Sequence, residues 1–135
     1  MQSVAQIAPT SKKSLLAGRI ISALPALFLL LDSVGKLIKP KEVVEGSIQL
    51  GYSESVILPL GIVLLVCAVL YIIPRTSVLG AILLTGYLGG AVATHVRVGN
   101  PLFTHTLFPV YIGALIWGGL FLRDERLRAL IPLRN

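Results

Sequence analysis

Five ionisable side chains lie inside or at the edge of long apolar segments of this sequence, where a charge is costly. They are Asp32, Lys36, His95, Arg97 and His105. Asp32 and Lys36 are four residues apart, a spacing that puts an acid and a base on one face of a helix. An imidazole can bind a proton near neutral pH or join a hydrogen-bond network. Such groups could supply hydrogen bonds or protons to a bound molecule.

Most of these residues also have a structural interpretation. Lys36 and Arg97 lie near the ends of their segments, from which long basic side chains can reach the lipid headgroups. His105 fits a surface or hydrogen-bonding role. A helical wheel places His95 and Arg97 on nearly opposite sides, so the two cannot face one cavity without a local distortion. Asp32 is the hardest to explain structurally, because its short side chain cannot reach the headgroups.

Four apolar segments carry these residues, each of about the 20 residues that a helix needs to cross a bilayer. They cover residues 15–38, 55–73, 76–98 and 102–122. Mean hydropathy is +0.86 and only 13% of the residues are charged, against about 25% in a soluble domain. The sequence therefore predicts an all-α integral membrane four-helix bundle, in one domain of residues 15–135. Residues 1–14 are polar and unpatterned, which predicts a flexible tail.

The Lys and Arg residues beside the four segments predict the orientation. With the N-terminus inside, eight of the 12 lie on the inner side, so both termini are expected in the cytoplasm. The five ionisable residues then fall in the outer half of the bilayer. Topology explains the net charge of +6, and no basic patch with interleaved aromatic residues indicates a nucleic-acid partner. The longest connection, residues 39–54, is compatible with a short surface helix or a structured loop.

Small residues predict how the helices associate, because apolar burial alone gives no driving force in lipid. Gly86 and Gly90 form a G-x-x-x-G spacing. Further small positions on the first, third and fourth helices include Gly18, Gly80, Gly89, Gly118 and Gly119. We expect these glycines to pack against neighbouring helices. Pro25 and Pro109 are expected to kink the first and fourth helices.

No pattern in the chain fits a known type of catalytic or metal site. The single cysteine excludes an intrachain disulfide and a CxxC pair. The spacing of the two histidines and Asp32 does not single out a metal site, so no metal is predicted. These residues assign no reaction, and whether the protein is an enzyme stays open.

Three stretches of the sequence carry a resemblance to a known family. They are "DSVGKL", "LYIIPRTSVLGAILLTGYLGGAVATHVRVG" and "WGGLFLRDERLRALIP". They are similar to the DoxX-like family of small four-helix bacterial membrane proteins, from the first helix to Pro132. The resemblance implies a location in the bacterial inner membrane. The positions that match the family pattern are Asp32, Lys36, Pro74, Arg75, Gly86, Gly89, Gly90, His95 and Arg97.

The resemblance implies little about activity. The wider DoxX group is named for a subunit associated with thiosulfate:quinone oxidoreduction, and other members are linked to redox stress or detoxification. Related sequences often carry an acidic residue in the second helix, whereas "PLGIVLLVCAV" has none. A proton relay through that helix is therefore not expected here.

Our leading hypothesis is a redox-associated membrane subunit that binds a quinone or a similar small apolar molecule near the outer leaflet. Asp32, Lys36 and His95 would supply hydrogen bonds or protons to a carbonyl of that molecule. The expected partners are the lipid bilayer and a soluble or membrane redox protein. The main alternative is a non-enzymatic membrane scaffold or partner subunit. A small-solute transporter is less favoured, because the chain has only four spans and few polar positions in their inner half.

Overall fold

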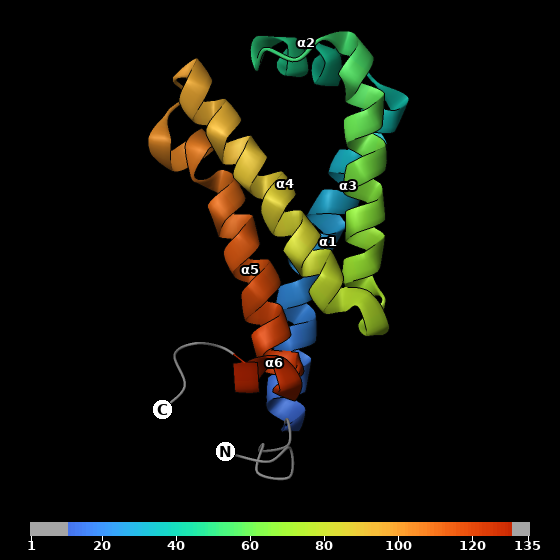
Figure 1. Cartoon of the computed structure of the whole chain (residues 1–135), viewed down its shortest axis with the longest axis vertical. Helices are drawn as coiled ribbons and strands as arrows, with labels where there is room; N and C mark the ends of the chain where they lie inside the picture. The colour runs from blue at the N-terminus through green and yellow to red at the C-terminus, as the bar shows by residue number, and fades with distance from the viewer. Residues whose placement is uncertain (1–10, 131–135) are drawn as a thin grey trace.

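The computed structural model of the protein describes residues 11–130, and its regular elements in this range are all helices (Figure 1). The four long helices are α1 (Lys12–Ile38), α3 (Ile57–Ile72), α4 (Ser77–Val98) and α5 (Phe108–Arg123). The shorter elements are α2 (Lys41–Gln49), the 3₁₀ turns η2 (Glu54–Val56) and η3 (Pro74–Thr76), the π-helical turn η4 (Leu102–Thr106) and α6 (Glu125–Leu130).

Four helical stretches are long and apolar enough to cross a membrane. Together with the short turns that continue them, they are Lys12–Ile38, Glu54–Ile72, Pro74–Val98 and Leu102–Arg123. Large apolar side chains such as Leu27, Leu31 and Phe103 are exposed on them, as expected for a surface that faces lipid. The predicted all-α membrane protein with four spanning helices is confirmed. Its orientation in the membrane stays a prediction.

The first helix begins earlier than the sequence predicted. Ser11 is its N-cap, and the side chain of Ser11 accepts a hydrogen bond from the backbone N–H of Ser14 at 3.1 Å. Capping of this kind satisfies a backbone donor that would otherwise have no partner. The predicted tail of residues 1–14 therefore includes helical residues from Lys12 onward, and residues 1–10 lie outside the described range.

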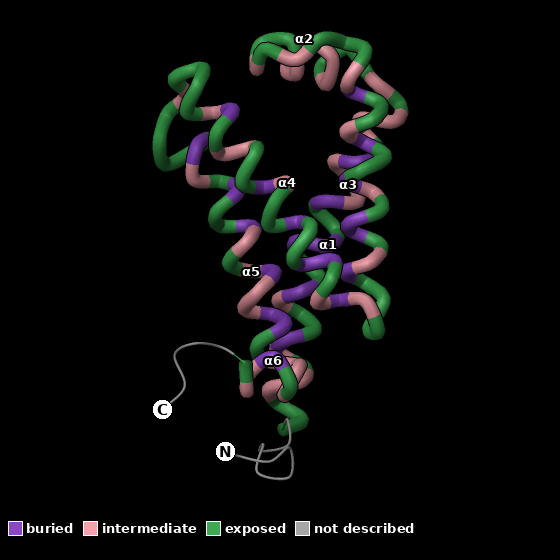
Figure 2. The backbone as a smooth tube through the Cα atoms, viewed as in Figure 1, coloured by how far each residue is buried: buried purple, intermediate pink, exposed green. Residues whose placement is uncertain are grey.

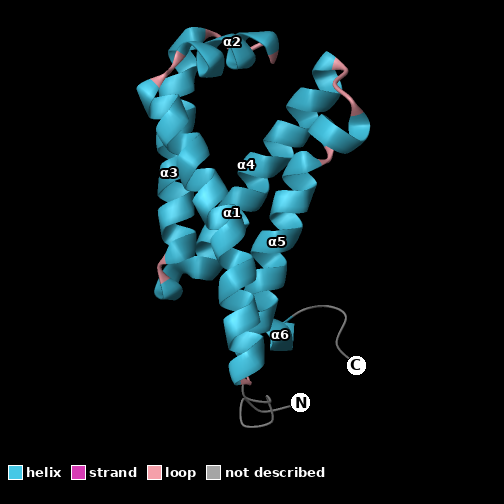
Figure 3. Cartoon of the chain, turned by 180° about the vertical axis from the view of Figure 1, so that it is seen from behind, coloured by secondary structure: helices cyan, strands magenta, loops and turns pink. Residues whose placement is uncertain are grey.

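The four long helices form a ring in which neighbours run antiparallel. α1 packs against α3 and α5, and α4 packs against the same two helices from the other side. The start of α1 and α6 lie at one end of the bundle, while α2 crosses the other end (Figures 1 and 3). We call these the terminal end and the α2 end. The buried apolar residues of the core include Leu29, Leu64, Tyr71, Leu84, Ile116 and Leu120.

α3 and α4 are closest at the turn that joins them and separate toward the α2 end. Both views show α4 and α5 leaning away from α1 and α3 there (Figures 1 and 3). Figure 2 shows that buried positions are dense in the middle of the bundle and sparse along α2. No residue of α2 is buried. The α2 end is therefore the less tightly packed part of the molecule.

Glycines make the closest helix contacts, and four positions are responsible. They are Gly18, Gly61, Gly80 and Gly119. At Gly80, for example, an added Cβ would lie 2.6 Å from the Cα of Tyr71, so only glycine allows α3 and α4 to approach so closely. Close backbone approach through small residues is the usual mode of helix packing in lipid.

Of the glycines that the sequence indicated, Gly18, Gly80 and Gly119 take part in this packing, whereas three on α4 do not. Gly86, Gly89 and Gly90 are exposed, and an added Cβ would meet nothing within 4 Å at any of them. The prediction that they pack against neighbouring helices is therefore wrong within the chain. The reason is their direction on α4, because the face toward α3 near the turn carries Gly80 instead.

The fourth spanning segment is not one continuous α-helix. It begins with the π-helical turn η4, and α5 starts only at Phe108. Pro109 consequently lies in the first turn of α5, where a proline costs no backbone hydrogen bond. The predicted kink at Pro109 is therefore wrong, whereas Pro25 does lie inside α1.

Candidate functional site

The Asp32–Lys36 pair forms within α1, as the spacing predicted. The Nζ of Lys36 donates to Oδ1 of Asp32 at 2.8 Å. The lysine side chain is 17% exposed and the aspartate side chain 38%. An added Cβ at Gly61 would lie 2.7 Å from the Cβ of Lys36, so the missing side chain on α3 makes room for the lysine. The pair is therefore held between α1 and α3 and keeps some access from outside.

Tyr87 of α4 lies seven residues before Thr94, on the same face of the helix. Its ring packs against the core. Among the described residues, its hydroxyl has no hydrogen-bond partner. The Lys36 ammonium, which carries three N–H donors, has Asp32 as its one partner in the same range. Donors therefore remain for a further molecule.

Two hydrogen bonds tie α4 to the connection between α2 and α3. The hydroxyls of Tyr52 and Thr94 are 2.7 Å apart. The Nη2 of Arg97 donates to the backbone carbonyl of Leu50 at 2.9 Å. Arg97 thus serves to fix the α2 end, and its guanidinium is directed to this connection rather than to Asp32.

His95 and His105 come together at the junction of α4 and η4. Their ring centroids are 6.0 Å apart with an interplanar angle of 73°. The Nδ1 of His95 is 2.7 Å from the side-chain amide of Asn100. The Nδ1 of His105 is 2.8 Å from the hydroxyl of Thr104. The two histidines, which the sequence placed at one depth, are therefore neighbours.

The five predicted residues are thus distributed over three places at the α2 end: the Asp32–Lys36 pair, the histidine pair and Arg97. No hydrogen bond or ion pair links Asp32 to His95 within residues 11–130. That they act as a single site stays a prediction. The opposite directions expected for His95 and Arg97 agree with their different partners.

Sequence reasoning missed Tyr52, Thr94 and Tyr87. Tyr87 and Thr94 are seven residues apart, which places them on one helix face, so their spacing was a usable signal. Nothing in the spacing of Tyr52 indicated its role, because it follows Gly51, whose positive φ of 93° turns the chain back toward the bundle.

The terminal end also holds polar contacts that the sequence did not indicate. The hydroxyl of Tyr71 donates to the carbonyl of Ile116 at 2.9 Å, in a buried position. The Nε of Arg123 donates to the hydroxyl of Ser22 at 2.9 Å, and its guanidinium lies 5.4 Å from the centre of the Tyr71 ring. Each of these groups has a partner within the protein, which indicates a structural role.

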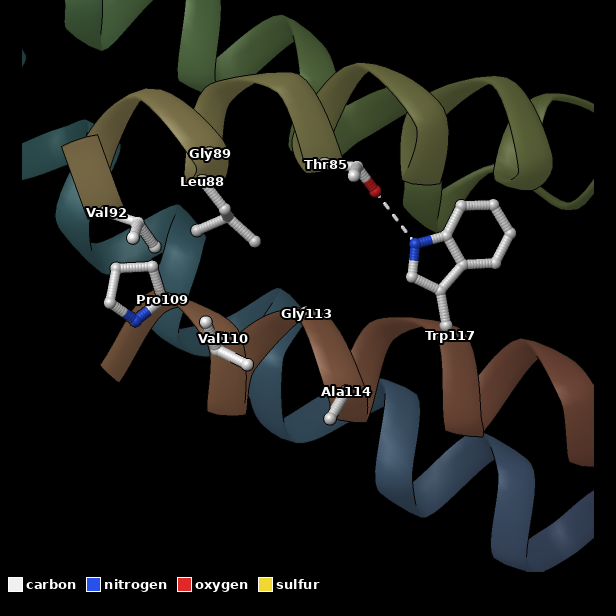
Figure 4. A pocket seen from close by; sticks show the side chains of 9 residues that line it. All are labelled: Thr85, Leu88, Gly89, Val92, Pro109, Val110, Gly113, Ala114 and Trp117. Carbon is white, nitrogen blue, oxygen red and sulfur yellow. Dashed lines mark hydrogen bonds between the residues drawn. The ribbon is translucent and has the colours of Figure 1, made fainter. Parts of the chain in front are cut away.

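A separate apolar groove of about 370 Å³ lies between α4 and α5 (Figure 4). The glycines Gly89 and Gly113 help to line it, and at one end the Nε1 of Trp117 donates to the hydroxyl of Thr85 at 2.8 Å. That hydroxyl in turn donates to the carbonyl of Ala81. The polar groups of the groove are therefore used within the protein, and we do not place the candidate site there.

Comparison with known proteins assigns the family but not an activity. No curated protein and no solved structure matches the chain. The family model described as the DoxX-like family matches residues 20–119. The matched range contains both polar pairs of the α2 end and covers most of the sequence. The chain therefore belongs to the DoxX-like family of proteins.

Proposed function

We propose that this protein is a redox-associated subunit of the bacterial inner membrane that binds a quinone or a similar small apolar molecule. The observation that carries the proposal is the unused bonding capacity of three side chains, two on α1 and one on α4. Among the described residues, the Lys36 ammonium and the Tyr87 hydroxyl have donors to spare, and Asp32 keeps a second carboxylate oxygen. Polar groups without partners are costly in a bilayer, so a ligand that satisfies them is stabilised there.

A quinone has the matching chemistry. Its ring carbonyls accept hydrogen bonds, and the rest of the molecule is apolar and dissolves in lipid. In the proposed complex, Lys36 donates to a carbonyl, and Asp32 keeps the lysine charged and oriented. Tyr87 supplies a second donor from α4. The electrons would come from a soluble or membrane redox partner.

A second function is favoured by one specific contact. Lys36 packs against Gly61, and its charge is neutralised by Asp32. The same pair could therefore serve to fix α1 on α3 in a non-enzymatic scaffold or partner subunit. In that case, the loss of Asp32 lowers stability and leaves ligand binding unchanged.

Binding of a short-chain ubiquinone analogue to the purified protein in detergent micelles tests the proposal. We expect saturable binding that weakens in Asp32→Asn and in Tyr87→Phe. Tyr111→Phe is a matched control, because the Tyr111 hydroxyl already donates to the carbonyl of Phe103 at 3.1 Å and is exposed. Its binding should equal that of the wild type.

The thermal unfolding of each variant is measured in parallel. Weaker binding in Tyr87→Phe at unchanged stability supports the quinone site. Absence of saturable binding in the wild type removes the proposal. Equal binding in all variants with a less stable Asp32→Asn protein favours the scaffold.

A further inference from the structure

We propose that His95 and His105 together bind one divalent transition-metal ion at the junction of α4 and η4. The ion belongs to the class for which imidazole is a preferred ligand. This class includes Cu²⁺ and Zn²⁺. The inference is independent of the quinone proposal, because the imidazoles share no hydrogen bond with Asp32 or Lys36 among the described residues.

The distance between the two rings suits a shared ion. Their centroids are 6.0 Å apart. Two imidazoles on one ion, with metal–nitrogen distances of about 2.0–2.1 Å, hold their centroids roughly 5–6 Å apart. His105 is exposed and His95 half-buried, so an ion has access to the His105 ring from outside the bundle.

The hydrogen bonds of the two rings leave the Nε2 atom of each ring available for a metal ion. In each histidine Nδ1 is the nitrogen with a partner, Asn100 for His95 and Thr104 for His105. Within residues 11–130, no hydrogen bond involves Nε2 of either ring. In metal sites, the nitrogen that does not bind the ion is commonly held by such a partner, which fixes the tautomer and the orientation of the ring.

The local backbone places both partners. Gly99, with φ of 74°, ends α4 and turns the chain back, so that the N–H of Asn100 donates to the carbonyl of His95 at 3.1 Å. The π-helical turn then begins, and the N–H of His105 donates to the carbonyl of Pro101 at 3.2 Å. The nine residues between the histidines thus form a closed turn. π-helical turns are frequent at functional sites.

The electrostatic setting accepts a cation. His95 is in the last turn of α4, where the carbonyl ends of the helix favour positive charge. The nearest competing charge on this helix, that of Arg97, is directed to the carbonyl of Leu50. Two protein ligands leave further coordination positions for water or for a small solute.

Titration of the purified, tag-free protein with Cu²⁺ and with Zn²⁺ tests the inference. The chain contains only two histidines, so imidazole binding can be assigned without ambiguity. Cys67→Ala serves as the background, which removes the one thiol. We expect one ion per chain, and loss of high-affinity binding in His95→Gln and in His105→Gln, because each variant removes one of the two ligands. Asn100→Ala should give a smaller loss, of roughly tenfold, because it removes only the partner of Nδ1.

Stoichiometry separates a shared site from two independent ones. If each histidine variant still binds an ion with wild-type affinity, or if the wild type binds two ions, the shared site is refuted. For Cu²⁺, the electron paramagnetic resonance spectrum should show coupling to two nitrogen atoms. Coupling to a single nitrogen contradicts the proposal. Thermal unfolding of each variant excludes misfolding as the cause of lost binding.

Discussion

Two glycine substitutions on α4 test whether the structure or the sequence pattern identifies the packed face. A Cβ at Gly80 would lie 2.6 Å from the Cα of Tyr71 and 2.8 Å from the carbonyl carbon of Leu70. Backbone atoms cannot move aside by a rotamer change, so we expect an overpacking cost of about 2–3 kcal/mol. The higher helix propensity of alanine returns about 0.5–1 kcal/mol. Gly80→Ala should therefore lower the free energy of unfolding by about 1–2.5 kcal/mol.

Gly86→Ala is the matched substitution on the same helix. Nothing lies within 4 Å of its added Cβ, so only the gain of about 0.5–1 kcal/mol remains. The difference between the two variants, about 2–3 kcal/mol, is independent of propensity. Unfolding in detergent can be followed by the fluorescence of Trp117, the single tryptophan. Equal stabilities, or a less stable Gly86→Ala, would refute the reasoning.

The remaining predictions concern side-chain contacts. Asp32→Asn and Lys36→Gln should each lower the free energy of unfolding by about 1–3 kcal/mol, less than the full cost of an unpaired charge in the membrane, because the pair is partly exposed. In a double-mutant cycle, the double variant should recover most of this loss, and additive losses would contradict a coupled pair. Tyr52→Phe removes the hydrogen bond to Thr94 and should lower the stability measured by thermal unfolding by about 1 kcal/mol. Hydrogen exchange in α2 should become faster in the same variant. Trp117→Phe should cost about 0.5–1.5 kcal/mol, and an unchanged melting temperature would show that its bond to α4 contributes nothing.

The sequence predicted the number of helices and their approximate ends because the thickness of the bilayer sets the length of a spanning helix. An apolar run of the right length has few alternatives in a membrane, and all four spanning helices follow from that constraint. The errors lie at places where hydropathy carries no information. Residues 12–14 joined α1 because Ser11 provides a cap. The break before Pro109 comes from a π-helical turn. Its residue types are those of an ordinary α-helix, so the sequence did not indicate it.

Packing direction was the least predictable property. Apolar and small residues surround a spanning helix on all sides, so its sequence has weak amphipathic character and does not identify the buried face. Gly80 and Gly86 illustrate this, since both look suited to close packing but only Gly80 contacts another helix. The ionisable residues were easier to predict, because an i,i+4 acid–base pair is a local geometric relation. Asp32 and Lys36 therefore form the expected bond.

The two proposed sites are separated by the geometry of α4. Thr94 and His95 are adjacent in the chain, so their side chains leave the helix about 100° apart, and Thr94 meets Tyr52 while His95 meets His105. Quinone binding and metal binding are therefore expected to be independent. His105→Gln should abolish high-affinity binding of Cu²⁺ and leave the affinity for the quinone analogue unchanged. If instead the variant also weakens binding of the quinone analogue, without loss of stability, the polar groups form one site across α4. The single cluster inferred from the sequence would then describe the α2 end better than two separate sites.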